Sequence, residues 1–309
     1  MSAPGVRSEI VRDRLLAALL EHAPVSPRME TGLRAAIDEA VRRPGKLVRG
    51  RLAWETVTAH GLDEESGLTL ATAVEYFHAA SLLLDDLPCM DNAVARRGHL
   101  CVHRVHGEAT AIMAALALIN RAYALVGFAF ATQPGAVRLQ AQACVDACLG
   151  TAGLVGGQAR DLRFSASART AREVSRVAIE KTGAMFWLAL LLPALLTAPT
   201  GAERRALEAL CVYWGLAYQA ADDLQDLLAS AEETGKTGGR DRLLGRPNLA
   251  AAIGVPATRG RIDRLLGQAA RTIDKLVEVR EAWSYLEEFQ RHFSGILVPA
   301  AAESAEVAA

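Results

Sequence analysis

Apolar residues recur along most of this chain at the spacing of an amphipathic α-helix. Near the N-terminus, EIVRDRLLAALLEHA gathers its large aliphatic side chains on one stripe: Ile10, Leu15, Leu16, Leu19 and Leu20. Turn-forming segments rich in Gly and Pro, such as RRPGK and ATQPGA, separate stretches of this kind. The pattern predicts about ten helices and no convincing strand.

Two predicted helices are apolar on nearly every side. The first, ATAIMAALALINRAYALVGFAFA, is long enough to span a membrane but carries Asn120 and Arg121 in its middle, where charge is costly in lipid. The second, MFWLALLLPALLTA, is too short and contains Pro193. We therefore expect buried helices of a large soluble bundle and no membrane span. The predicted fold class is all-α, with residues 1–309 forming a single domain and flexible tails at 1–8 and 300–309.

The composition suits a large hydrophobic core, and the near-zero net charge produces no overall electrostatic field. Hydrophobic residues make up 51% of the 309 residues, charged residues 22%, and the formal net charge is −1. No nucleic acid partner is expected, and any anion site has to be local. The five cysteines form no dense framework and the N-terminal residues show no secretory pattern, so a reduced, cytoplasmic location is expected.

A first cluster of carboxylates, DDLPCMD, follows the apolar stretch AVEYFHAASLLL. Pro88 should end or kink the helix, which lets the chain curl so that Asp91 returns toward Asp85 and Asp86. Carboxylates at the mouth of an apolar helix are costly unless a cation neutralises them. Oxygen-only ligands in small groups suit hard cations, and Mg²⁺ prefers phosphate groups as its further partners.

A second cluster occurs in YQAADDLQDLLAS. Asp222 and Asp226 are four residues apart and share one helix face, with Asp223 beside them. One such triplet alone is more often a solvated helix end. Two triplets, each preceded by an apolar helix, indicate two facing carboxylate sets that hold Mg²⁺ over a diphosphate.

These two motifs, in this order, resemble the aspartate-rich motifs of the trans-isoprenyl diphosphate synthases, members of the polyprenyl synthetase family. The likeness runs from about residue 40 to about residue 250. It implies an isoprenoid-synthase helical bundle with a central active-site cavity, a homodimer, and about three Mg²⁺ per active site. The implied metal ligands are Asp85, Asp86, Asp91, Asp222, Asp223 and Asp226.

The resemblance also implies a set of diphosphate-binding residues. PGKLVRG places Lys46 and Arg49, with His78 and Arg97, on isopentenyl diphosphate, and RRG places Arg96 on the allylic diphosphate. GGQARDL, EKTGA, YQAADD and TGKTGGRD supply the remaining substrate residues: Gln158, Asp161, Lys181, Thr182, Gln219 and Lys236. Arg, Lys and metal ions neutralise a diphosphate as it departs. Asp85, Asp86, Lys181, Asp222 and Asp223 are the implied catalytic residues.

The implied reaction condenses isopentenyl diphosphate with an allylic diphosphate into a short all-trans prenyl diphosphate. In the family, bulky residues four or five positions before the first Asp stop the product at fifteen carbons, but here these positions are Ser81 and Ala80. Phe77, the next large residue on that face, lies ~12 Å from Asp85 along the helix, against ~7.5 Å for Ala80. We therefore predict geranylgeranyl diphosphate as the product, with farnesyl diphosphate as the alternative.

Two further alternatives stay open on the same scaffold. A terpene cyclase would lack the isopentenyl residues, and a non-catalytic regulatory subunit would have broken aspartate motifs. Several positions depart from the family pattern with effects that the sequence does not predict: Gly50, Leu84, Ala93, His99 and Asn248.

Overall fold

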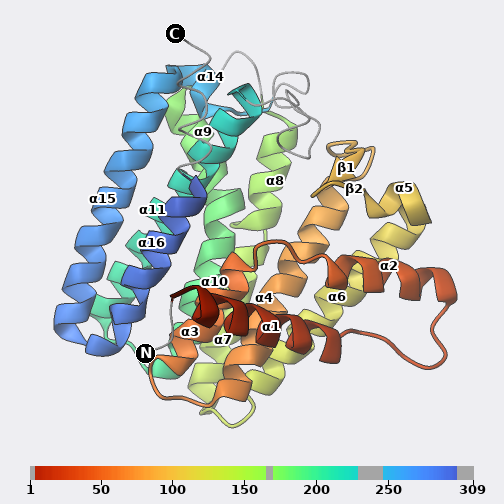
Figure 1. The fold of residues 1–309 in the computed structure, drawn as a ribbon, viewed down its shortest axis with the longest axis horizontal. Helices are drawn as coiled ribbons and strands as arrows, with labels where there is room; N and C mark the ends of the chain where they lie inside the picture. The colour runs from red at the N-terminus through yellow and green to blue at the C-terminus, as the bar shows by residue number, and fades with distance from the viewer. Residues whose placement is uncertain (1–3, 165–169, 229–245, 298–309) are drawn as a thin grey trace. The chain divides into compact units, whose positions relative to one another are not determined.

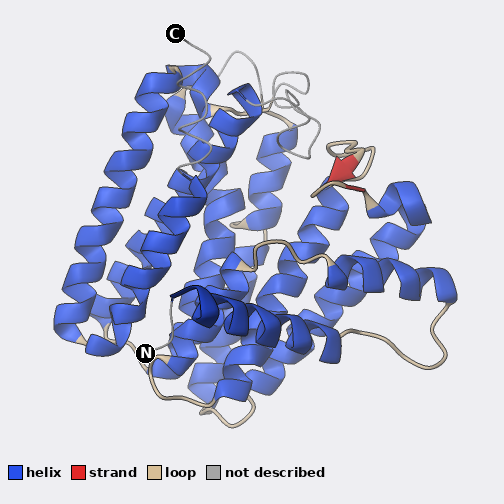
Figure 2. Ribbon diagram, in the orientation of Figure 1, coloured by secondary structure: helices blue, strands red, loops and turns tan. Residues whose placement is uncertain are grey.

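The computed structural model describes residues 4–164, 170–228 and 246–297, with side chains described from residue 9 onward. Contacts cluster the chain into two compact units, residues 1–141 and 142–309, and each unit is described by itself. The expectation of a single domain stays a prediction. The described residues are overwhelmingly helical (Figure 2), which confirms the all-α class.

The first unit is a helical assembly centred on α4. It contains α1 (Pro4–Glu21), α2 (Thr31–Arg42), α3 (Val48–Thr58), α4 (Glu64–Asp85), β1 (Ala95–Arg96), β2 (His99–Leu100), α5 (Val102–His106) and α6 (Glu108–Ala129). Helix α4 packs along both α3 and α6 (Figure 1). Most of its side chains are buried, which explains why this stretch is apolar on nearly every side.

Local signals explain where α4 begins and ends. Asp63 accepts a hydrogen bond from the backbone N–H of Ser66 and so caps the first turn. The helix ends at Asp85, three residues before Pro88, as the sequence predicted. The carboxylates of the first motif therefore lie at the C-terminal end of a buried helix.

A short hairpin, missed by the sequence analysis, follows the first motif. β1 pairs with β2 in antiparallel register, Ala95 opposite Leu100 and Arg96 opposite His99. The two turn residues, Arg97 and Gly98, both have positive φ, at 55° and 77°, as a type I′ turn requires. Strands this short carry no alternating pattern from which they could be predicted.

The second unit is built around the long helix α11. Helix α7 (Gly135–Leu149) leads into this unit, and the remaining elements are α8 (Leu154–Leu162), α9 (Ala171–Ala178), η2 (Ile179–Gly183), α10 (Ala184–Ala194), η3 (Leu195–Thr197), α11 (Gly201–Leu228), α14 (Leu249–Ile253), α15 (Val255–Val279), η4 (Glu281–Ser284) and α16 (Tyr285–Leu297). Helix α11 packs on α10 and α15, and an aromatic cluster of Phe186, Trp214, Phe289 and Phe293 fills the core.

Two glycines allow backbones to meet closely in this unit. A Cβ at Gly215 of α11 would lie 2.7 Å from the Cα of Gly183, and a Cβ at Gly157 of α8 would lie 2.6 Å from the backbone nitrogen of Lys181. Only glycine permits such approaches. They bring α8 and α11 against η2, a single turn of π-helix of the kind often found at functional sites.

Three helical segments within the described residues are long and apolar enough to cross a membrane by length and composition alone. They are α4, α6 and residues 171–197, and their apolar windows are 67%, 39% and 56% buried, respectively. The burial is lowest in α6. The expectation that the chain does not span a membrane stays a prediction.

Candidate active site

The first aspartate motif folds back on itself after α4. The backbone N–H of Asp91 donates to the carbonyl of Asp85 at 2.9 Å, and that of Ala93 donates to the carbonyl of Asp86 at 3.1 Å. Leu87 accepts from Met90 at 2.9 Å and from Asn92 at 2.8 Å. The curl that Pro88 predicted is therefore present, and it returns Asp91 to the end of the helix that carries Asp85.

Arg96 of the hairpin neutralises the middle carboxylate of this motif. Its Nη2 lies 2.6 Å from Oδ1 of Asp86, and its Nε donates to both carboxylate oxygens at 2.9 and 3.0 Å. Asp86 is only 4% exposed, so the pair is largely withdrawn from water. Burial opposes the charge of Arg96, but the hydrogen bonds and charge of Asp86, with the charge of Asp85, leave its pKa raised. Arg96, which is expected to bind the allylic diphosphate, is thus held directly by the first motif.

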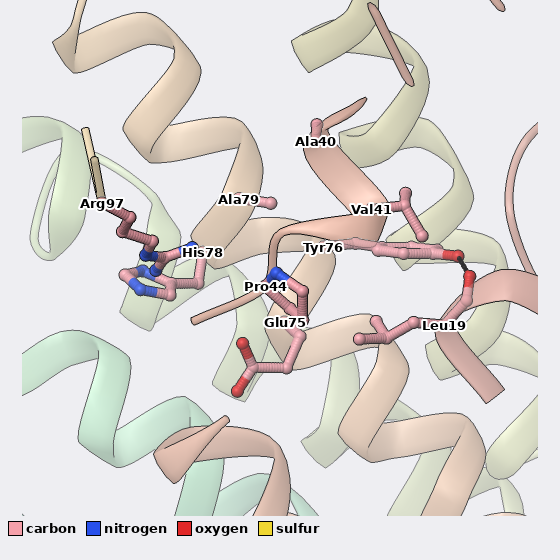
Figure 3. Close-up of a pocket in the computed structure, with 9 residues that line it drawn as sticks. All are labelled: Leu19, Ala40, Val41, Pro44, Glu75, Tyr76, His78, Ala79 and Arg97. Atoms are coloured by element: carbon pink, nitrogen blue, oxygen red, sulfur yellow. Dashed lines mark hydrogen bonds between the residues drawn. The ribbon is translucent and has the colours of Figure 1, made fainter. Parts of the chain in front are cut away.

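The residues expected to bind isopentenyl diphosphate come from three neighbouring segments of the first unit. Lys46 is exposed in the loop before α3, Arg49 is buried in the first turn of α3, and His78 lies on α4. Arg97, at the hairpin turn, donates to the carbonyl of Arg43 at 2.6 Å. His78 and Arg97 line the same pocket (Figure 3), which also includes Glu75.

Burial and three arginines affect the protonation of His78. Burial is the main cause that lowers the pKa of His78 well below its ordinary value, and the positive charges of Arg49, Arg97 and Arg96 lower it further. The imidazole is therefore neutral at physiological pH, and it offers one N–H donor to an anion without adding charge.

Gly45 makes room for the guanidinium of Arg97. A Cβ on Gly45 would lie 2.5 Å from the Cζ atom of Arg97, and Gly45 has a φ of 77°. Any side chain would therefore collide with the arginine and strain the backbone. The loop that carries Lys46 is shaped to accept Arg97.

The second motif lies on α11, with Asp222 and Asp226 partly exposed and Asp223 buried. Asp223 is 1% exposed. Its Oδ1 accepts from Nε2 of Gln219 at 2.8 Å, and its Oδ2 accepts from the backbone N–H of Leu249 at 2.6 Å. Asn248 donates to the backbone carbonyl of Asp223 at 3.1 Å. Asp223 therefore joins α11 to the start of α14, while Asp222 and Asp226 are the more accessible carboxylates.

A polar chain extends from this motif to η2. The Thr182 hydroxyl donates to Oε1 of Gln219 at 2.7 Å, and Nζ of Lys181 lies 2.9 Å from Oδ2 of Asp161 on α8. Beside them, the side-chain amide of Gln158 is buried, and neither its nitrogen nor its oxygen has a hydrogen-bond partner among the described residues. A buried amide without partners costs about 1–3 kcal/mol, so this one is suited to receive a polar ligand.

Two predicted features lie beyond these contacts. Lys236 falls outside the described residues. Within the described part of the chain, no three His, Cys, Asp or Glu side chains gather closely enough to form a ready metal site. Metal binding by the six aspartates therefore stays a prediction, with an all-oxygen donor set that fits Mg²⁺.

The chain-length residues occupy the buried middle of α4. Ala80 is fully buried and Phe77 is 4% exposed. The ring of Phe77 meets the ring of Tyr123 on α6 edge to face, with centroids 5.0 Å apart. The Ser81 hydroxyl donates a hydrogen bond to the backbone carbonyl of His78 at 2.9 Å. The large residue expected below Ala80 is thus braced by a neighbouring helix.

Two features of the site were missed by the sequence analysis. One is the π-helical turn that carries Lys181 and Thr182, because its extra backbone spacing depends on packing against α8 and α11. The other is Glu75, a buried acid three residues before His78. A carboxylate inside an apolar helix was the available signal for Glu75.

Comparison with known proteins places this geometry in a family. Residues 30–283 match the polyprenyl synthetase family. Geranylgeranyl diphosphate synthase of Pseudescherichia vulneris is 37% identical over 231 residues, which is 74% of this chain and 73% of that protein. Farnesyl diphosphate synthase of Geobacillus stearothermophilus is 32% identical, over 74% of this chain and 78% of its own length.

A solved structure shares the fold. A geranyltransferase from Helicobacter pylori, crystallised with magnesium and isoprenyl diphosphate, superimposes with a TM-score of 0.83 at 23% identity, over 97% of this chain and 99% of that one. At that identity the likeness supports the fold alone, whereas the sequence match covers most of the chain. This protein therefore belongs to the polyprenyl synthetase family.

Proposed function

We propose that this protein is a prenyltransferase that joins isopentenyl diphosphate to an allylic diphosphate and releases pyrophosphate. The observation that carries the proposal is the arrangement along α4 of two sets of residues suited to a diphosphate, an acidic set that would bind it through Mg²⁺ and a basic set that would bind it directly. Asp85 and His78 are seven residues apart and so share one face, separated by ~10.5 Å along the helix. One set surrounds Asp85 with Asp86, Asp91 and Arg96, and the other surrounds His78 with Arg49 and Arg97. Two diphosphates need two such sets.

The donor chemistry supports Mg²⁺ on the allylic diphosphate. Asp86 is paired with Arg96, and Asp223 accepts hydrogen bonds from Gln219 and Leu249. Asp85, Asp91, Asp222 and Asp226 are more exposed than these two buried carboxylates, and we assign them first to the metal. Bound Mg²⁺ would neutralise the departing diphosphate.

The residues of the chain then have two roles in the reaction. Lys46, Arg49 and Arg97 bind the diphosphate of isopentenyl diphosphate, which fixes its double bond in place. Arg96 and Lys181 stabilise negative charge on the leaving pyrophosphate. The carbon–oxygen bond of the allylic substrate breaks and pyrophosphate leaves. The double bond of isopentenyl diphosphate attacks the allylic cation, and the resulting cation loses a proton to the released pyrophosphate, which completes the new allylic diphosphate.

The contacts of Thr182 suit it to the intermediate cation. Its hydroxyl proton points to Gln219, so its oxygen presents lone pairs in the opposite direction. Gln219 is held in turn by Asp223. Preorganised dipoles of this kind stabilise charge that develops in a transition state.

We infer geranylgeranyl diphosphate as the main product. Ala80 and Ser81 are small, and the first large residue on this face of α4 is Phe77, whose ring is braced by Tyr123. One relative is named a geranylgeranyl diphosphate synthase, with a twenty-carbon product, and another a farnesyl diphosphate synthase, with a fifteen-carbon product. Both names support a short-chain prenyl diphosphate as the product.

We also infer a cytoplasmic homodimer. Helix α6 exposes large apolar side chains at helical spacing, namely Met113, Leu116 and Tyr123, each about half exposed. An apolar helix face of this kind favours burial against a second copy. All five cysteines are free, which suits a reducing compartment.

Product analysis tests the function. The purified chain is incubated with Mg²⁺, isopentenyl diphosphate and each allylic primer in turn, and the products are sized by chromatography. We expect a twenty-carbon diphosphate and its loss on chelation of Mg²⁺. A cyclic hydrocarbon formed without isopentenyl diphosphate, or the absence of product from the chain alone, would contradict the proposal.

A further inference from the structure

Glu75 is a buried acid beside the residues that we assign to isopentenyl diphosphate. It is 5% exposed and lines the same pocket as His78 and Arg97 (Figure 3). A carboxyl group at such a depth needs hydrogen bonds or charges that offset its desolvation. Glu75 has no part in the proposed reaction as described so far.

The carboxyl group of Glu75 caps the first turn of α3 from the neighbouring helix. The backbone N–H of Gly50 donates to its Oε1 at 2.7 Å. Gly50 is the third residue of α3, so its N–H is one of those that have no acceptor within the helix. The residue at the usual capping position, Leu47, has no oxygen in its side chain and makes no cap hydrogen bond. Glu75 supplies the missing acceptor.

Gly50 leaves the space that this contact needs. A Cβ at position 50 would lie 2.9 Å from Cγ of Glu75, closer than side-chain atoms normally approach. Either a larger residue or the loss of the N–H would separate α3 from Glu75. The pair of Gly50 and Glu75 is therefore a matched contact between α3 and α4.

The same carboxyl group faces two of the assigned cations. Burial raises the pKa of Glu75, while the Gly50 hydrogen bond and the charges of Arg49 and Arg97 oppose that rise. Arg49 immediately precedes Gly50 in the capped turn, and Arg97 lines the pocket with Glu75. Glu75 thus shares the pocket with Arg97 and holds the backbone turn that carries Arg49.

We propose that Glu75 is a positioning residue for the isopentenyl diphosphate site, one that fixes the first turn of α3 through Gly50 and orients Arg49 and Arg97 toward the substrate. This inference rests on the proposed function. It predicts that loss of the acceptor weakens binding of isopentenyl diphosphate and leaves the allylic substrate unaffected, because Arg96 and the aspartates do not depend on the α3 turn.

The test compares Glu75→Leu with Glu75→Gln. Leucine removes the acceptor, whereas glutamine keeps an oxygen where Oε1 accepts from Gly50. We expect Glu75→Leu to raise KM for isopentenyl diphosphate about tenfold or more, with KM for the allylic substrate and kcat each within about threefold. Glu75→Gln should restore most of the affinity. Equal changes in both KM values, or no change in either, would overturn the proposal.

Glu55 offers a matched control on α3. It is also 5% exposed and forms a buried ion pair with Arg51 at 2.9 Å, but it does not line the pocket. Glu55→Leu should lower the melting temperature without raising KM for isopentenyl diphosphate more than KM for the allylic substrate. A selective rise in KM for isopentenyl diphosphate in this control would contradict a specific role for Glu75.

A second variant covers the case in which Glu75→Leu does not fold. Gly50→Ala keeps the N–H and forces the new Cβ against Glu75, so it should raise KM for isopentenyl diphosphate selectively. An unchanged KM in Gly50→Ala would refute the matched contact. If the wild-type chain makes no product from isopentenyl diphosphate, the proposed function itself fails, which is a different result from equal KM changes in an active enzyme.

Discussion

The length of the product is predicted to depend on one buried face of α4. In Ala80→Phe, a benzyl group is introduced five residues before Asp85, ~7.5 Å along the helix, whereas Phe77 lies eight residues before it, ~12 Å along the helix. The difference of ~4.5 Å corresponds to about one isoprene unit. We expect Ala80→Phe to shift the main product from twenty to fifteen carbons, and Phe77→Ala to lengthen it.

The structure also sets the stability cost of these changes. Ala80 is fully buried, so a phenylalanine there overpacks the site and should cost about 1–3 kcal/mol. Phe77 is nearly as buried and contacts Tyr123 edge to face, so its truncation should cost about 3–5 kcal/mol if the surroundings do not relax. Thermal unfolding of each variant has to be measured beside its products, because an unstable enzyme also releases shorter chains.

Chromatography of the dephosphorylated products gives the chain-length distribution. Ala73→Phe is the matched control, because Ala73 is also fully buried on α4 but lies beyond Phe77 as seen from Asp85. It should cause similar strain without shortening the product. If Ala80→Phe folds and leaves the distribution unchanged, or if Ala73→Phe shortens the product equally, Phe77 does not close the cavity and the reasoning is refuted.

Three further predictions concern the two motifs, the isopentenyl site and the acid stability. Asp85→Ala and Asp222→Ala should each lower kcat by orders of magnitude with unchanged circular dichroism, and wild-type turnover in both would refute the metal assignment. Lys46→Ala and Arg49→Ala should raise KM for isopentenyl diphosphate much more than for the allylic primer in steady-state kinetics, and equal increases would mean that the wrong diphosphate was assigned. Burial raises the pKa of Glu203, but hydrogen bonds from Trp283 and Thr200 and the charge of Arg280 outweigh it and leave the pKa lowered. The ionised Glu203 side chain therefore stabilises the fold at neutral pH, and this stabilisation is lost as the pH falls through the folded-state pKa. Glu203→Gln should lower the free energy of unfolding by about 1–3 kcal/mol at pH 7 and by less in acid, as measured by denaturant unfolding. A loss of stability that does not depend on pH would contradict this.

The fold class and the end of α4 before Pro88 could be predicted because they depend on local physics. Helical spacing of apolar residues, the cap at Asp63 and the break before Pro88 act within a few residues of each other. The curl that returns Asp91 to the end of α4 is equally local, and it was predicted from Pro88 alone. The hairpin was missed because two residues per strand carry no periodic signal.

The division of roles among the aspartates was not predictable from their spacing. In the sequence, Asp85 and Asp86, or Asp222 and Asp223, look alike. Packing separates them, since Asp86 is buried against Arg96, and Asp223 is buried under the start of α14. Burial makes an unpaired carboxylate costly, so Asp86 and Asp223 need these partners, whereas Asp85 and Asp222 are only partly buried.

The sequence by itself determined the helical class and the two acidic motifs, because these follow from periodicity and from chemistry within short segments, and its resemblance to a family implied the residues of two diphosphate sites. Only the tertiary structure decided which side chains act together. Asp161 is twenty residues from Lys181, Thr182 is 37 from Gln219, and Gly50 is 25 from Glu75, yet each pair shares a hydrogen bond. Such partners are chosen by which helix faces pack together and by where a glycine allows close approach, and neither is encoded in the local pattern of either segment.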